Sequence, residues 1–471
     1  MDMIQPEENR SRTITLVEKV MQEIHRRIKG RRLDPGMKLP SIRKFAEHMQ
    51  VSKSTVVDAY DRLTAEGTIT ARKGAGFYVA GALPPLSLTE LAPKLDRDID
   101  PLWVSRQSLE AEEDLLKPGC GWFPASWMPE DCLRRALRSL SRAAPAALTD
   151  YGTPGGFIPL REYLVRRMAG YGIFSDLEQT ILTESGTQTI DLLCRFFLEP
   201  GDTVLVDDPC YFNFHALLKA HRVHVVSVPY TPTGPDLGQF AEALKTHKPR
   251  LYITNSSIHN PTGAILSPAT AHGLLKLADK TDLVIIEDDI FADLEVTPAP
   301  RLAALDGLQR VVHIGSFSKT LSASARCGFI ATRSDWIEGL IDLKIATSFG
   351  GNPLAAQLVW HVLKDGSYRK YLTALHERLA SARLKTSVRL KEIDIEPWIM
   401  PSAGMYLWGR LPTGFEAADI AGKALKENIV LAPGNVFSLL PSASHYLRFN
   451  VAQSDSPRIF ETLKAILIGR Q

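Results

Sequence analysis

Several common features are absent from this sequence of 471 residues. No run of 18 apolar residues occurs, so we expect no transmembrane helix, and the polar start MDMIQPEENR predicts no signal peptide. The five cysteines form no CxxC pair and have no histidine cluster at zinc-ligand spacing. We therefore expect free thiols, no metal site and a cytoplasmic protein.

Length and charge divide the chain into unequal parts. The formal net charge of +2 is uninformative, but residues 1–80 hold 15 Lys/Arg against 10 Asp/Glu, and the remainder holds 40 against 43. A small basic region on a mildly acidic one predicts an anionic partner for residues 1–80. The length predicts two or three domains.

Residues 1–80 are predicted to form three short helices and a β-hairpin. The first helix covers about residues 13–29, and the next two begin after Ser41 and Ser52, both suitable N-caps. Residues 68–71 and 76–79 suit the two strands of a hairpin. This order is that of a winged helix-turn-helix, whose third helix enters the major groove of DNA. A basic module that binds protein is the alternative.

Polar and basic side chains occupy the DNA-facing positions of this plan. Those that we expect at the DNA are Ser41, Arg43, Lys53, Ser54, Thr55, Arg72, Lys73 and Gly76. The motifs GxxLPSxR from residue 36 and VSxSTV from residue 51 resemble the GntR family of bacterial repressors. That resemblance implies that the positions of Arg43, Ser54, Thr55 and Gly76 lie at the DNA.

Residues 81–118 are predicted to be a linker, because they begin Pro-rich and lack clear periodicity. From residue 119 to 471, short apolar strands alternate with helices. The expected strands are 180–183, 203–206, 223–228, 250–254, 283–287, 311–314 and 328–331. This spacing predicts a largely parallel α/β sheet with its active groups at the carboxyl ends of the strands.

Lys319 is the most informative residue of this second region. It follows an apolar strand, lies among the hydroxyls of SFSKT, and has Arg326 seven residues further on. A lysine can form a Schiff base with an aldehyde cofactor, while Ser316 and Arg326 hold a phosphate of that cofactor. The sequence therefore predicts a phosphorylated aldehyde at Lys319.

Other strand ends carry residues that suit such a cofactor. Gly186 and Thr187 open a helix and offer a phosphate seat, and Tyr211 offers a ring for stacking. Asn260, in the turn NPTG, can bind a phenolic oxygen, and Asp288 can hold a pyridinium nitrogen. Taken singly, Tyr211 suits packing better, turn chemistry explains Asn260 equally well, and Asp288 could be a solvated acid at a strand end.

Together these motifs resemble class I aminotransferases of pyridoxal 5′-phosphate (PLP) fold type I. The resemblance implies a large, mostly parallel sheet domain and a smaller C-terminal α+β subdomain, with PLP on Lys319. The residues that it implies around PLP are Asp288, Asn260, Tyr211, Gly186, Thr187, Ser316 and Arg326. It also implies that Tyr151 reaches a neighbouring subunit's phosphate and that Arg448 grips a substrate carboxylate.

Two positions depart from that family. Phe291 stands where the family commonly has Tyr, which removes a phenol from the cofactor's ring oxygen and places efficient transamination in doubt. Ala323 stands where Pro is frequent, a mild change in the segment between Lys319 and Arg326.

A GntR-like region joined to an aminotransferase-like one resembles the MocR subfamily of regulators. The leading hypothesis is a homodimeric transcription factor that binds operator DNA and PLP and responds to PLP, an amino acid or an amine. The resemblance implies that each DNA-binding region crosses to the partner subunit. Two alternatives remain: a working aminotransferase with an accessory DNA-binding region, and a scaffold that no longer binds PLP.

Overall fold

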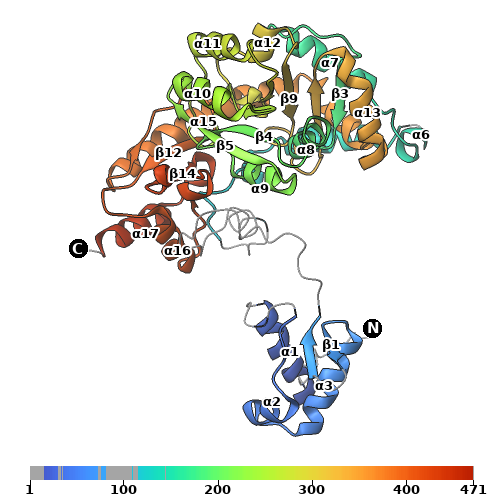
Figure 1. Ribbon diagram of the computed structural model, residues 1–471, viewed down its shortest axis with the longest axis vertical. Helices are drawn as coiled ribbons and strands as arrows, with labels where there is room; N and C mark the ends of the chain where they lie inside the picture. The colour runs from blue at the N-terminus through green and yellow to red at the C-terminus, as the bar shows by residue number, and fades with distance from the viewer. Residues whose placement is uncertain are drawn as a thin grey trace, which may run out of the picture. The chain divides into compact units, whose positions relative to one another are not determined.

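The computed structural model describes residues 15–29, 33, 36–72, 76–80, 109, 115–143 and 145–469. They form two compact units, here called the head (residues 15–80) and the body (residues 115–469), as Figure 1 shows. Lys73 and, apart from Leu109, positions 81–114 of the predicted linker lie outside the described residues.

The head has the predicted order of three helices and a hairpin. Its elements are α1 (Leu16–Lys29), α2 (Ile42–Met49), α3 (Lys53–Ala65), β1 (Ile69–Arg72) and β2 (Gly76–Val79). Ser41 and Ser52 cap α2 and α3 by accepting the backbone N–H groups of Lys44 and Thr55, which satisfies donors at the start of each helix. Val57 on α3 is exposed although it is apolar.

The core of the head is formed by one apolar face from each helix and by the hairpin. Its fully buried members include Val20, Ile24, Phe45, Val56, Tyr60 and Leu63. The Tyr60 hydroxyl donates to the Pro40 carbonyl at 2.9 Å. This bond ties α3 to the segment that precedes α2.

The large sheet of the body has the order β3-β10-β9-β8-β7-β4-β5-β6. Its strands are β3 (Thr180–Thr183), β4 (Thr203–Asp208), β5 (His224–Thr231), β6 (Gly234–Pro235), β7 (Leu251–Thr254), β8 (Val284–Asp288), β9 (Val311–Ser316) and β10 (Gly328–Ala331). The neighbouring strands β9, β8, β7, β4 and β5 pair in parallel. Strand β10 is antiparallel to both β3 and β9, and β6 is antiparallel to β5. The predicted, largely parallel sheet is confirmed.

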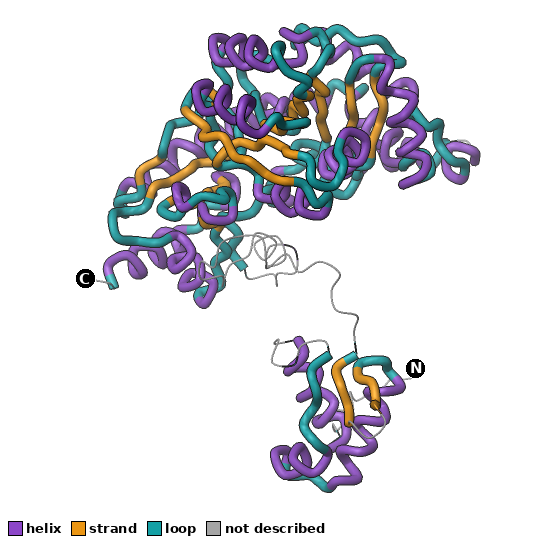
Figure 2. The backbone as a smooth tube through the Cα atoms, in the orientation of Figure 1, coloured by secondary structure: helices purple, strands orange, loops and turns teal. Residues whose placement is uncertain are grey.

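Helices cover both faces of this sheet (Figure 2). One face packs on α5 (Glu130–Leu140), α7 (Ile158–Ala169), α10 (Leu237–His247), α11 (Pro268–Ala278), α12 (Leu302–Asp306) and α14 (Pro353–Leu363). The other packs on α8 (Gly186–Phe197), α9 (Phe212–Ala220) and α13 (Ser334–Ser348). Successive residues such as Ile285 and Ile286 alternate between the two cores, as strand geometry requires.

A smaller antiparallel sheet forms the C-terminal part of the body. Its order is β11-β12-β14-β13, with β11 (Glu396–Pro397), β12 (Tyr406–Arg410), β13 (Ala432–Pro433) and β14 (Tyr446–Asn450). Helices α15 (Ser367–Lys391), α16 (Ala417–Lys426) and α17 (Pro457–Ile468) pack on it. The short helix α6 (Pro145–Thr149) contacts α14.

The end of the predicted linker belongs to this smaller sheet. Leu116 forms a parallel bridge with Ile429, and its N–H and C=O bond the backbone of Asn428 and Val430. Leu116 therefore belongs to the small sheet of the body, and the domain boundaries drawn from the sequence stay predictions. The pairing joins segments more than 300 residues apart, which local periodicity does not reveal.

All five cysteines lie within the described ranges and are buried as free thiols. Among the described helices, none has the length and apolarity needed to cross a bilayer.

Candidate functional site

Six strands of the large sheet end at one edge. Strands β3, β9, β8, β7, β4 and β5 run in one direction, so their carboxyl ends share that edge. Strand β10 runs the other way, and its first residue, Gly328, pairs with both Thr183 and Ser316. The polar residues that follow these strands, and those that precede β10, are brought together here.

Lys319 follows β9 at this edge. Its Nζ donates to the Gly121 carbonyl at 2.8 Å. Burial, and then the charge of Arg448, lower the pKa of Lys319 to about 8, although Asp288 acts in the opposite direction. A lysine with this pKa is partly neutral near neutral pH, and a neutral amine is the form that attacks an aldehyde.

Asp288 ends β8 and is buried. Burial raises the pKa of Asp288 to about 7, and its carboxylate accepts the backbone N–H of Ile290 at 3.3 Å. The side chain of Asn255 fixes the Asp288 main-chain carbonyl at 3.0 Å. A neighbouring cation, such as a protonated ring nitrogen, would stabilise the ionised form of this buried acid.

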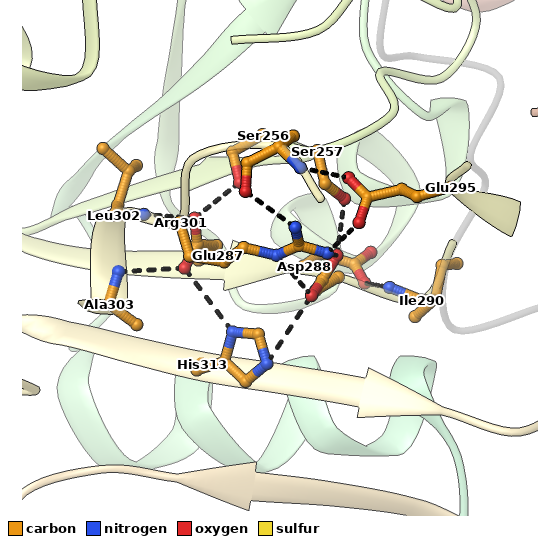
Figure 3. A network of polar contacts seen from close by, with 12 residues as sticks. Ser256, Ser257, Glu287, Asp288, Ile290, Glu295, Arg301, Leu302, Ala303 and His313 are labelled. Carbon is orange, nitrogen blue, oxygen red and sulfur yellow. Dashed lines mark hydrogen bonds and ion pairs between the residues drawn. The ribbon is translucent and has the colours of Figure 1, made fainter. Parts of the chain in front are cut away.

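A buried ionic network holds the strand on which Asp288 sits (Figure 3). Glu287 and Asp289 flank Asp288, and His313 of β9 lies 3.5 Å from Glu287 and 3.7 Å from Asp289. Arg301 pairs with Asp289 at 3.1 Å. Because side chains alternate along a strand, this network lies on the face opposite to the Asp288 carboxylate and makes the strand end rigid.

The N-terminus of α8 faces the end of β9. A Cβ built on Gly186 would lie 3.3 Å from Ile290 Cγ2 and 3.8 Å from Ser316 Cβ. The Ser316 hydroxyl accepts the N–H of Ser318 at 3.2 Å, and Thr187 is exposed. Backbone amides and hydroxyls thus converge on a space that suits an anion.

Arg326 precedes β10 and has a left-handed backbone with φ of +43°. Its side chain is exposed and pairs with none of the described carboxylates. Its charge still lowers the pKa of Lys319, after the larger effects of burial and Arg448. An unpaired guanidinium close to the site suits a phosphate.

Arg448 joins the small sheet to the site. Its guanidinium is buried, donating to Asn260 Oδ1 at 2.8 Å and to the Gly119 carbonyl at 2.7 Å. Tyr211, at the N-cap of α9, is half-buried, and its pKa is raised by burial and then lowered in part by Arg448. The predicted residues Asn260, Tyr211 and Arg448 are therefore brought towards one another.

Sequence reasoning missed the segment that closes the site, residues 119–122, here called the entry segment. Its four successive carbonyls each accept a bond from a site side chain: Gly119 from Arg448, Cys120 and Trp122 from Asn450, and Gly121 from Lys319 and Tyr406. Gly119 is required there, since a Cβ would lie 2.4 Å from the backbone of Leu431 and Ala432. The closely spaced glycines of GCG were the available signal.

Tyr151 is not brought to this site. It is 79% exposed and packs on Phe349, with ring centroids 4.9 Å apart. Both rings lie near a separate cavity of about 340 Å³, which Tyr151 and Lys344 help to line. Within one chain Tyr151 therefore remains outside the Lys319 cluster.

The DNA-facing candidates lie on the surface of the head. Ser41, Lys53 and Ser54 are exposed, and Thr55 is half-buried. Arg43 is exposed and pairs with Glu47 one turn along α2 at 3.1 Å.

The hairpin presents two further candidates. Arg72 lies over the ring of Tyr78, 4.3 Å from its centroid. Gly76 has φ of +100°, a conformation that glycine adopts freely. Lys73, between them, lies outside the described residues.

The residues of the body fit PLP. Lys319 offers an amine with a lowered pKa, Asp288 a buried carboxyl, and Gly186 a helix start that a Cβ would crowd. PLP needs these three groups: an imine partner, an anion for its ring nitrogen and donors for its phosphate. In the part of the chain that the structure describes, no group of three or more His, Cys, Asp or Glu side chains is arranged to hold a metal.

Comparison with known proteins gives two family matches. Residues 125–466 match the model of aminotransferase class I and II, and residues 16–79 match that of bacterial regulatory proteins of the gntR family. The chain is 27% identical over 415 residues to the HTH-type transcriptional regulator YisV of Bacillus subtilis, covering 85% of each. It is also 27% identical to NorG of Staphylococcus aureus, an HTH-type transcriptional regulator, over 85% of this chain and 92% of NorG.

Solved structures match the body. LysN, an α-aminoadipate aminotransferase from Thermus thermophilus, is 25% identical with a TM-score of 0.71 and covers 78% of this chain and 94% of its own. A kynurenine aminotransferase of Pyrococcus horikoshii has a TM-score of 0.72 at 24% identity, over 82% and 96%. These matches imply PLP as the cofactor. The chain belongs to the aminotransferase class I and II family and, with its GntR-type head, has the MocR architecture.

Proposed function

We propose that this protein is a transcriptional regulator that binds operator DNA through its head and PLP through Lys319 of its body. The observation that carries the proposal is the pairing of two different sites on one chain. A half-buried lysine and a buried acid, both with shifted pKa values, lie at one sheet edge of the body, and two helices of the head expose Arg43, Lys44 and Lys53. The names of the relatives YisV and NorG support the regulatory role.

Each site residue has a proposed task around PLP. Asp288 holds the ring nitrogen and Tyr211 stacks on the ring, while Asn260 donates its amide to the ring oxygen. The phosphate is held by Gly186, Thr187, Ser316 and Arg326. When bound, PLP supplies an aldehyde that exchanges its amine partner, so a primary amine can compete with Lys319.

The proposed effector is an amino acid or other amine. Arg448 already forms two hydrogen bonds to oxygen atoms, those of Asn260 and Gly119, and a carboxylate is a stronger acceptor for the same guanidinium. Binding changes DNA affinity to the extent that the effector prefers one state of the protein, typically ~1–3 kcal/mol.

The proposal includes a homodimer. Tyr151 and Phe349 are exposed beside a cavity of the same body, and a tyrosine so placed can serve a partner's phosphate. The heads are proposed to cross to the partner subunit, as in the MocR resemblance.

The cofactor claim is tested by absorbance. The purified protein incubated with PLP should be yellow and retain the colour through dialysis, whereas Lys319→Ala should not. Lys344→Gln is the matched control, because burial also lowers the pKa of Lys344 to about 8 although this lysine lies at another cavity. A wild-type protein that stays colourless with PLP would refute the cofactor assignment.

The regulatory claim is tested by DNA binding to the region upstream of the protein's own gene, with and without PLP and candidate amines. We expect PLP to change the affinity. The competing aminotransferase function is favoured by the intact pair of Lys319 and Asp288. It predicts steady-state turnover with common amino donors near ~1–1000 per second, whereas we expect much slower turnover.

A further inference from the structure

Tyr406 lies beside Lys319 although its element is distant in sequence. It begins β12 of the small sheet and is 1% exposed. Its hydroxyl donates to the Gly121 carbonyl at 3.3 Å, the oxygen that also accepts from Lys319 Nζ at 2.8 Å. A Cβ built on Gly121 would lie 3.5 Å from the hydroxyl and 3.8 Å from Nζ, so both polar atoms face one glycine.

The ring of Tyr406 is held from two sides. The Arg448 guanidinium carbon lies 4.4 Å from its centroid, and Phe291 packs edge-on with centroids 5.7 Å apart at 85°. Lys319 Nζ is 5.8 Å from the Phe291 centroid. Of these two packed rings, Phe291 has no hydroxyl, so the phenol beside Lys319 comes from Tyr406.

The phenol of Tyr406 remains protonated. Burial raises its pKa, and the opposing charge of Arg448 is the smaller effect. Tyr406 is therefore a neutral O–H donor at physiological pH, next to an amine that is partly neutral.

Binding of an aldehyde to Lys319 changes the hydrogen bonds that the Gly121 carbonyl accepts. The neutral amine forms a C=N bond, and its two hydrogens leave with the aldehyde oxygen as one water. Nζ then loses the hydrogens through which it donated to Gly121. The Tyr406 hydroxyl remains as the donor at that position, next to the newly attached ring.

We propose that Tyr406 is a positioning residue for the PLP bond at Lys319, and that its hydroxyl donates to the phenolic oxygen of the PLP ring. This inference rests on the proposed PLP site. The donor favours the form in which that oxygen carries most negative charge, which is the form with an unprotonated C=N bond. Removing the hydroxyl should therefore favour protonation of the C=N nitrogen.

The test is a pH titration of the absorption spectrum of the PLP-loaded protein. Tyr406→Phe should raise the midpoint by about one pH unit, the effect of one hydrogen bond to a charged group. Tyr446→Phe is the control, because that half-buried ring stacks on Trp408 of β12 but lies away from Lys319. An unchanged midpoint in loaded Tyr406→Phe would overturn the inference.

A double variant separates the hydroxyl from packing. Tyr406→Phe combined with Phe291→Tyr moves the phenol across the edge contact between the two rings, and the midpoint should return towards that of the wild type. A midpoint that stays raised would assign the shift to lost packing and overturn the role of the hydroxyl. If the wild type takes up no PLP, the proposed function is refuted and the role of Tyr406 with it. If the wild type takes up PLP, these titrations test the role of Tyr406 separately.

Discussion

The head and the body treat their functional charges in opposite ways. Arg43 has a side chain that is 77% exposed and pairs with Glu47 in water, whereas Lys319 is half-buried, Asp288 is buried, and their pKa values are about 8 and 7. DNA is a long polyanion, and hydrated cations are attracted to it through the release of counterions. A covalent site instead needs groups near neutrality, and burial produces them.

This contrast predicts which property a substitution in each region should alter. Burial makes each charge in the body depend on its neighbours, so one change there alters several groups. Exposed pairs in the head are worth little to its stability, so their removal should affect DNA binding and little else. The experiments below separate the two regions.

The largest effect is expected from Asp288→Ala. Removing the acid leaves the PLP ring nitrogen without a buried partner, and loss of one member of a buried pair typically costs ~3–5 kcal/mol. We expect PLP affinity to fall by about a hundredfold or more, measured by equilibrium dialysis. Asp455→Ala, at an exposed acid of the same body, should bind PLP normally; equal affinity in both variants would refute the role of Asp288.

The rate of PLP capture should depend on pH through Lys319. The neutral amine reacts, so the rate should fall about tenfold per unit below its pKa and level off above about 8. Stopped-flow absorbance on the cofactor-free protein, corrected for the titration of PLP with a free amine, measures this profile. A rate that keeps rising to pH 10 would show that burial does not lower the pKa of this lysine.

In the head, Arg43→Ala should weaken binding to the upstream DNA by about tenfold and reduce the salt slope by about one. The PLP spectrum should not change. Arg62→Ala is the matched control, since Arg62 forms the same exposed pair, with Asp58 at 3.1 Å, in the last turn of α3. Equal losses in both variants would indicate a general charge effect and remove Arg43 from the interface.

The smallest effect is expected from the loss of either of two equivalent helix N-caps. Ser52 in the head and Ser267 in the body each accept the N–H of a threonine three residues on, at 3.1 Å. Alanine at either should cost ~1 kcal/mol. In calorimetry Ser52→Ala should lower the head's transition by ~4–8 °C, and Ser267→Ala should lower the body's by ~2 °C or less, because the larger unit has the larger unfolding entropy. Equal shifts would show that the two units unfold together.

Much of the fold could be predicted because it is local. Strands 180–183 and 328–331 have the predicted ends, since periodicity and turn residues encode them. Lys319 and Asp288 lie at one edge because β8 and β9 are parallel, and Arg326 lies there because β10 runs antiparallel to β9.

The rest depends on contacts that no local pattern carries. Tyr406 and Gly121 are 285 positions apart, yet they share a hydrogen bond beside Lys319. Two of the small sheet's strands have two residues each, too few for an alternating pattern. Val57 is apolar but exposed because burial on α3 is decided by its packing partners.

The carbonyls of the entry segment depend on hydrogen-bond donors that the proposed ligands also need. It lies close to the start of the body, which begins at residue 115, and the hydrogen atoms that it accepts belong to Lys319, Tyr406, Arg448 and Asn450. An aldehyde on Lys319 or a carboxylate on Arg448 claims the same hydrogen atoms. On the proposed function, a ligand and the entry segment would therefore compete for one set of hydrogen-bond donors.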